Sequence, residues 1–235
     1  MKKIPWVLAP LLLHGPAVMA APCTNATLDV YTASGFTCAI GTLRFDDFSW
    51  RSNSIGASFE TVNLPDAVTV TPQDGAGGIG FNFSNLGLTF TAPGSNVTSD
   101  ISFDVTALSG SIAGASLALG SHSFTGTGES YAYFQDGGSS FLTVVDDPRD
   151  YVFGFPAALT DAASFADVTS LDLFSGGAAV VDFPGGTGAG TAETDDYTVL
   201  LVPAAPVSAV PEPASPWLLG AGLAGLAGLR RRRAA

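Results

Sequence analysis

The sequence predicts an all-β protein, an antiparallel β-sandwich of jelly-roll-like type, with a separate apolar helix at each end. Short segments alternate apolar and polar residues with a period of two, as in residues 101–106, where Ile101, Phe103 and Val105 share one face. Glycine, asparagine, aspartate and proline separate these segments at close spacing. No long stretch has a sustained helical period. This combination favours an antiparallel sandwich over any helical architecture.

The first twenty residues, 1–20, form a predicted signal peptide with a signal helix. Lys2 and Lys3 precede an apolar stretch, and the small residues Val18 and Ala20 fit cleavage after residue 20. Interior prolines argue against a buried helix of the fold. We therefore expect export through this segment, with residues 21–202 as the β-sandwich ectodomain.

The first strong strand signal contains an irregularity. In TLRFDDFSW, Leu43 and Phe45 have one parity, whereas Phe48 and Trp50 have the other. A β-bulge at residues 46–47 would place all four apolar side chains on one face. The alternative is that the two aspartates end one strand and begin another.

Further strand candidates follow along the ectodomain. They cover residues 67–71, 81–83, 86–90, 101–106, 130–134, 139–145, 151–155, 178–183 and 197–202. The pair at 81–90 is predicted to form two strands around a tight turn at Ser84 and Asn85. Residues 160–165 are the one segment with a helical signal, because Thr160 is a fair N-cap, and a single turn is predicted there.

The exported part is strongly acidic. Of nine lysines and arginines, only Arg44, Arg51 and Arg149 lie between the two end segments, whereas every acid except Glu212 lies there. Such a surface repels nucleic acid and anionic lipid, so we expect no nucleic-acid partner. The charge would attract divalent cations or basic partners, or would simply keep a secreted domain soluble.

Two cysteines, Cys23 and Cys38, lie near the start of the mature chain. Export places them in an oxidising compartment, so we expect a disulfide. It would close a loop of about fifteen residues and stabilise the fold by roughly 3 kcal/mol in the chain-entropy model. A reactive thiol or a metal pair is the alternative, although neither a CxxC spacing nor a nearby histidine supports it.

Catalytic constellations are weak in this sequence. The mature chain has one histidine, His122, between Ser121 and Ser123, and strand alternation places it on the opposite face from both. We interpret it as a surface residue. Paired carboxylates at 46–47, 146–147 and 195–196 lack the defined separation that glycoside hydrolysis requires. We therefore expect no enzyme activity and no catalytic residue.

A cluster of three acids follows a predicted strand in VVDDPRDY. Asp146, Asp147 and Asp150 offer the oxygen ligands that calcium prefers on loops. No EF-hand pattern is present, and Arg149 can neutralise the cluster instead, which would leave a solvated acidic turn. Calcium at this loop is the one cofactor that the sequence suggests.

Aromatic residues in strand segments offer a second kind of binding surface. Trp50, Tyr131 and Tyr133 are candidates for a platform on which sugar rings stack. Each of the three fits a buried position in the sheet equally well.

The C-terminal end predicts a membrane segment. A proline-rich linker at residues 203–213 leads into the apolar run 214–229, whose sixteen helical residues would span about 24 Å of a roughly 30 Å hydrocarbon core. An arginine cluster follows, within the predicted cytoplasmic tail 230–235, and the positive-inside rule leaves the ectodomain outside. The cluster consists of Arg230, Arg231, Arg232 and Arg233. A single transmembrane helix, either temporary or permanent, is predicted.

Three ordered elements of this end resemble the PEP-CTERM sorting tail. They are the motif Val210, Pro211, Glu212 and Pro213, the short apolar span, and the terminal arginines. The resemblance implies a Gram-negative bacterium with an exosortase that processes such tails near Pro-Glu-Pro. It also implies an inner-membrane intermediate and a final place at the cell surface or in the extracellular matrix, associated with exopolysaccharide. The four motif residues would then be recognised by the processing enzyme.

A second resemblance concerns the segment CAIGTLRFDDF. Its residues Cys38, Ile40, Gly41, Phe45 and Phe48 are similar to the N-terminal region of a group of uncharacterised PEP-CTERM proteins. The resemblance agrees with the disulfide and implies no activity.

The sequence therefore predicts a non-enzymatic exported protein of the cell surface or extracellular matrix, associated with exopolysaccharide. A polysaccharide-binding module, with calcium as an assisting ion, is the alternative. A secreted hydrolase is the third choice.

Overall fold

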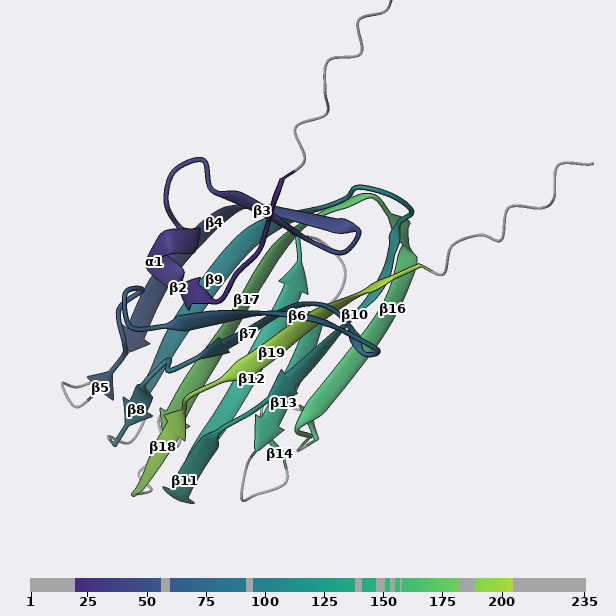
Figure 1. The fold of residues 1–235 in the computed structure, drawn as a ribbon. Coiled ribbons are helices and arrows are strands. Elements are labelled where there is room, and N and C mark those ends of the chain that lie inside the picture. The colour runs from purple at the N-terminus through teal and green to yellow at the C-terminus, as the bar shows by residue number, and fades with distance from the viewer. Residues whose placement is uncertain are drawn as a thin grey trace, which may run out of the picture.

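The computed structural model describes residues 20–55, 60–91, 95–137, 141–146, 151–152, 155–156, 158–181 and 189–204. Most of these residues belong to β-strands, which form sheets packed as a sandwich (Figure 1). The helix among them, α1 (Leu28–Tyr31), has four residues. The all-β sandwich is confirmed. The predicted signal helix and transmembrane helix lie outside the described residues.

The larger sheet has seven strands. Their order is β1 (Ala21–Pro22), β3 (Thr37–Ile40), β4 (Leu43–Ile55), β9 (Ser95–Ala107), β17 (Ser170–Val181), β12 (Gly128–Asp136) and β13 (Phe141–Asp146). Neighbouring strands are antiparallel, except that β1 runs parallel to β3. The long strands β4, β9 and β17 form the centre of this sheet.

The second layer is built from a six-stranded and a four-stranded sheet. The six-stranded order is β16 (Thr160–Val168), β10 (Ile112–Leu119), β19 (Tyr197–Pro203), β7 (Gly78–Ser84), β6 (Thr69–Gly75) and β2 (Ala26–Thr27). The four-stranded order is β11 (His122–Gly126), β18 (Gly190–Thr194), β8 (Leu88–Phe90) and β5 (Glu60–Thr61). A small ribbon joins β14 (Tyr151–Val152) to β15 (Phe155–Pro156). Figure 1 shows β6, β7 and β19 crossing in front of β9 and β17.

Aromatic side chains from both layers form the centre of the core. Phe45 on β4 and Phe81 on β7 are fully buried, and their ring centroids are 4.8 Å apart. Phe48 stacks on Phe103 of β9 at 5.0 Å. Large inward-facing rings on β4, β7 and β9 therefore hold the two layers together, because each buries a large apolar area.

The predicted β-bulge is present in β4. Between the Asp46–Asp104 pair and the Ser49–Ser102 pair, β4 has one residue more than β9. Asp47 takes up the extra length with a φ of 53°, in the left-handed region. The apolar residues on both sides of the bulge are buried or half-buried in the core, as predicted: Leu43, Phe45, Phe48 and Trp50.

One local prediction is wrong, and another is confirmed in its strands. Residues 160–165 are part of strand β16, not a helical turn, because pairing with β10 along its length overrides the N-cap signal of Thr160. Exposed and half-buried side chains alternate along this strand. The two strands predicted on either side of Ser84 and Asn85 are present as β7 and β8, but they do not pair with each other: β7 pairs with β6 and β19, whereas β8 pairs with β5 and β18. Asn85, with a φ of 59°, lies where the chain passes from one sheet to the other.

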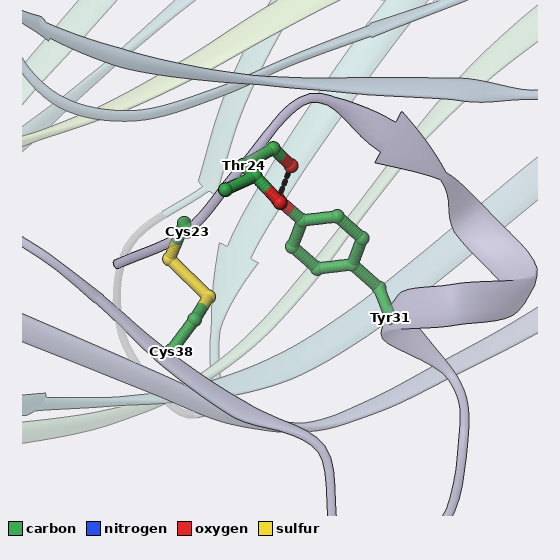
Figure 2. Close-up of a disulfide and its surroundings, with 4 residues drawn as sticks. All are labelled: Cys23, Thr24, Tyr31 and Cys38. Atoms are coloured by element: carbon green, nitrogen blue, oxygen red, sulfur yellow. Dashed lines mark hydrogen bonds between the residues drawn. A yellow bond between two sulfur atoms is a disulfide. The ribbon is translucent and has the colours of Figure 1, made fainter. Parts of the chain in front are cut away.

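The predicted disulfide joins Cys23 to Cys38, whose Cα atoms are 4.8 Å apart (Figure 2). It ties the segment after β1 to β3. Beside it the buried Tyr31 donates its phenolic hydrogen to the carbonyl oxygen of Thr24 at 2.6 Å. Burial raises the pKa of Tyr31 to about 12. The covalent and hydrogen-bonded links together hold the N-terminal segment against the sandwich.

Candidate functional site

The outer face of the seven-stranded sheet carries polar and aromatic side chains in rows that cross the strands. One row contains Tyr133 on β12, Gly176 on β17, Asp100 on β9 and Arg51 on β4, each directly opposite the next. Tyr133 donates a hydrogen bond to one carboxylate oxygen of Asp100. Arg51 contacts the other carboxylate oxygen at 3.2 Å through Nε. Four strands thus converge on a single carboxylate.

Gly176 makes this convergence possible. A β-carbon at this position would lie 2.6 Å from the hydroxyl oxygen of Tyr133 and 2.8 Å from the carbonyl oxygen of Ser99. Because glycine has no side chain, the phenol of Tyr133 lies across β17 and reaches Asp100. The local sequence SGG therefore creates the space for a side chain from the neighbouring strand.

Asp100 is only 7% exposed, and its two donors satisfy the buried carboxylate. The pKa of the Tyr133 phenol is raised far above its ordinary value, first by burial and then by its hydrogen bond to Asp100 and the charge of that carboxylate. Tyr133 therefore remains a protonated donor to Asp100.

The adjacent row contains Gln135, Phe174, Ser102 and Ser49, in that order across β12, β17, β9 and β4. The hydroxyl oxygens of Ser49 and Ser102 are 2.7 Å apart and share a hydrogen bond. Phe174 is half-buried, and its ring centroid is 5.0 Å from the guanidinium carbon of Arg51. An aromatic ring therefore lies at the centre of a polar sheet face.

Residues of these two rows, together with Asp172 and Gly137, line a pocket of about 360 Å³ on the sheet face. Its lining consists of Ser49, Arg51, Asp100, Ser102, Gln135, Gly137, Asp172 and Phe174. The lining offers one aromatic surface, several hydrogen-bond donors and two carboxylate acceptors. The volume is within the range of ligand sites for small molecules or for a segment of a polymer.

A row of three aspartates borders the pocket. Asp172 on β17, Asp104 on β9 and Asp46 on β4 lie directly opposite one another. The pKa of Asp104 is raised, first by burial and then by the charges of Asp172, Asp47 and Asp46. Arg44 reaches this row through an ion pair of 3.0 Å with Asp46. The pocket is therefore bordered by a concentration of negative charge.

The acidic loop predicted to bind calcium is described only in part. Asp146, at the end of β13, lies with one carboxylate oxygen 2.6 Å from Nε2 of His122, whereas Asp147 and Asp150 are outside the described residues. Nδ1 of His122 is 2.5 Å from the carbonyl oxygen of Gly120. Within the described ranges, no three His, Cys, Asp or Glu side chains are grouped as a metal site would require.

His122 is less exposed than the surface position that we predicted for it. The side chain of His122 is 14% exposed, because β11 places it against the end of β13. Both ring nitrogens have acceptor partners, so the flanking serines are not its partners. Ser123 instead donates to Glu193 at 3.1 Å. The paired carboxylates also lie apart: residues 46–47 form the bulge of β4, and residues 195–196 connect β18 to β19.

Of the three candidate aromatics, Tyr131 and Tyr133 lie on the outer face, with ring centroids 6.0 Å apart. Trp50 instead lies on the core side, opposite Ile101, and donates to Ser99 Oγ at 2.9 Å. Phe174 was not a candidate. In LDLFSGG the leucines alternate inward, so the parity of Phe174 assigns it to the polar face, a signal that the sequence does contain.

Residues 209–233 match the PEP-CTERM protein-sorting motif, which confirms the resemblance of the C-terminal end. The motif, which contains Val210–Pro213 and the terminal arginines, lies outside the described residues. No helix within the described residues is long and apolar enough to cross a membrane. No curated protein matches this chain.

Several solved structures show distant similarity. TmCBM61 in complex with beta-1,4-galactotriose has 10% identity and a TM-score of 0.27, and the match covers 64% of this chain and 87% of that one. A xylan-binding module, CBM15, has 16% identity and a TM-score of 0.26, over 66% and 92% of the two chains. A family 11 carbohydrate-binding module from Clostridium thermocellum has 9% identity and a TM-score of 0.23, over 77% and 96%. At these TM-scores the similarity says nothing about the ligand of this chain.

Proposed function

We propose that this protein is a non-enzymatic, exported protein of the cell surface or extracellular matrix that binds polysaccharide through the outer face of its seven-stranded sheet. The sorting motif at residues 209–233 supports export and membrane-anchored sorting in a Gram-negative bacterium. An exosortase then processes the tail near Pro211–Pro213, and the ectodomain associates with exopolysaccharide.

The pocket around Phe174 is the observation that carries the binding function. A sugar ring has an apolar C–H face and a rim of hydroxyl groups. The Phe174 ring suits the C–H face, and the polar groups of Arg51, Gln135 and Ser102 suit the hydroxyls. The surrounding lining is too polar for a lipid chain, and its mixture of donors and acceptors matches a polyol.

The contacts of the described polar groups support binding without catalysis. Both nitrogens of His122 already have acceptor partners, so this ring is not poised to activate a hydroxyl nucleophile. In the pocket, both carboxylate oxygens of Asp100 already accept hydrogen bonds, one from Tyr133 and one from Arg51. We also propose that binding needs no metal ion, since Asp146, one of the expected calcium ligands, pairs with His122.

Calorimetric titration of the full-length chain in detergent tests the binding function. The probes are neutral hexasaccharides of three backbones: cellohexaose, mannohexaose and galactohexaose. We expect at least one to bind, with or without a chelator. Phe174→Ala should weaken that binding roughly tenfold, in line with a central aromatic contact. Phe124→Ala, at a half-buried aromatic of β11 in another sheet, is the matched control and should bind like the wild type. Absence of binding to all three probes would refute the proposed function.

The processing step has its own test. The intact mass of the protein recovered from its native host should place the C-terminus near Pro211–Pro213, and the protein should be found outside the inner membrane. A full-length tail in the inner membrane would contradict removal of the anchor and would leave a permanent one.

A further inference from the structure

We infer that the Phe174 pocket binds polysaccharides without carboxylate groups in preference to those built from uronic acids. This inference rests on the proposed function and adds the class of glycan that the site accepts. It follows from three features of the site. They are the one cation among the lining residues, the carboxylates in and beside the pocket, and the extension of the pocket toward the aspartate row.

Arg51 is the one cation among the residues that line the pocket, and it already has two partners. Its Nε contacts the carboxylate of Asp100 at 3.2 Å, and its guanidinium lies over the Phe174 ring at 5.0 Å. Because Asp100 already offsets the charge of this group, a uronate would gain little net attraction from it. A neutral sugar hydroxyl can instead accept a hydrogen bond from the outward-facing nitrogens of the guanidinium, since the side chain is 71% exposed.

Four carboxylates lie in or beside the pocket, against the single cation Arg51 in its lining. Asp100 and Asp172 line it, and Asp104 and Asp46 continue the row that Asp172 begins. Neighbouring strands are about 4.8 Å apart, so these charges lie within about one Debye length of a bound sugar at physiological salt. Arg44, paired with Asp46, offsets only part of this charge.

A polymer that follows the length of the pocket would meet this charge. The pocket extends from Arg51 to Gly137, and Gly137 is close to Asp172 at one end of the aspartate row. A chain that stacks on Phe174 and continues past Asp172 therefore passes beside the row. Each added carboxylate would meet uncompensated negative charge, whereas a neutral chain would not. The site thus discriminates by repulsion as well as by attraction.

The raised pKa of Asp104 agrees with this arrangement. Burial contributes most, and the charges of Asp172, Asp47 and Asp46 contribute further. The carboxylates of the row therefore already repel one another in the free protein, and an additional anion would increase that repulsion.

The test compares two sugars that differ only at C6, where a carboxylate replaces a neutral hydroxymethyl group. Each neutral hexasaccharide of the binding panel is paired with the same hexasaccharide oxidised at C6 to the uronic acid, and both are titrated into the full-length chain at about 20 mM salt, where screening is weak. We expect the uronate to bind at least about tenfold more weakly. The difference should shrink at high salt.

Two charge variants identify the cause. Asp104→Asn removes a carboxylate that does not line the pocket, so affinity for the neutral sugar should be unchanged, whereas affinity for the uronate should rise by roughly threefold. Asp167→Asn makes the same change on β16, in the other layer, and should affect neither.

The outcomes separate the two claims. If no neutral sugar binds, the proposed function fails and the inference fails with it. If neutral and oxidised sugars bind equally, the selectivity is refuted while the proposed function stands. If Asp104→Asn behaves like Asp167→Asn, the aspartate row is not the source of the selectivity, and the inference is overturned as stated.

Discussion

Asp104 lies between two like charges, and its replacement by asparagine should stabilise the protein at neutral pH. Asp46 and Asp172 are directly opposite it on the neighbouring strands. Like charges in this position destabilise a sheet, by about 0.2–1 kcal/mol for each pair. Because Asp104 is only half-buried, screening reduces this effect, and we expect Asp104→Asn to add about 0.5–1 kcal/mol at low salt.

The pH dependence of this gain has a definite sign. The folded-state pKa of Asp104 is raised above the ordinary value of 3.8. A raised pKa means that this group's contribution to stability is fully present below its unfolded pKa and is lost as the pH rises through the folded value. At pH 7 the wild type therefore has the unfavourable charge that the asparagine variant lacks. Below about pH 3 the carboxyl is protonated and neutral, and the two proteins should be equally stable.

Thermal unfolding followed by circular dichroism measures this effect. A gain of about 1 kcal/mol corresponds to a Tm increase of about 2–4 °C for a domain of this size. Asp167→Asn is the control for a simple change in net charge and should shift Tm by less than half as much. An unchanged Tm at pH 7, or a gain that persists undiminished at pH 3, would refute the assignment of repulsion to the aspartate row.

Three further changes test other parts of the structure. Replacement of Cys23 and Cys38 by serine should cost about 3 kcal/mol, visible as a lower midpoint in denaturant unfolding, and an unchanged midpoint would contradict a stabilising disulfide. Asp47→Gly should raise the free energy of unfolding by up to about 1 kcal/mol, because glycine adopts the φ of 53° without strain. A loss of stability would show that contacts of the aspartate side chain outweigh the backbone strain. Gly176→Ala should cost about 1–3 kcal/mol because its β-carbon would collide with the Tyr133 hydroxyl, and double replacement with Tyr133→Phe should recover part of the loss.

Local patterns explain which predictions were confirmed. The bulge in β4 could be predicted because the parity change between Phe45 and Phe48 is visible within a few residues. The disulfide followed from two cysteines and an oxidising compartment. Residues 160–165 were assigned wrongly because Thr160 resembles a cap, whereas the strand is determined by pairing with β10, more than forty residues earlier in the chain.

The site itself depends on register between distant strands. Tyr133, Gly176 and Asp100 form one row only because β12, β17 and β9 are neighbours in the sheet, an order that no local pattern reveals. The pairing of His122 with Asp146 likewise joins residues 24 positions apart through the approach of β11 to β13. The sequence could supply the candidate aromatics and acids, but their grouping into a pocket required the topology.

The most direct test of the central claim is to locate the bound glycan. Amide chemical shifts of the full-length chain are recorded in detergent by NMR, during titration with the neutral hexasaccharide that binds most tightly. We predict that the largest changes occur on the outer face of β4, β9, β17 and β12, centred on Phe174, and disappear in Phe174→Ala. Changes centred on β6, β7 or the β11–β18 pair would contradict the assignment of the sheet-face pocket as the binding site.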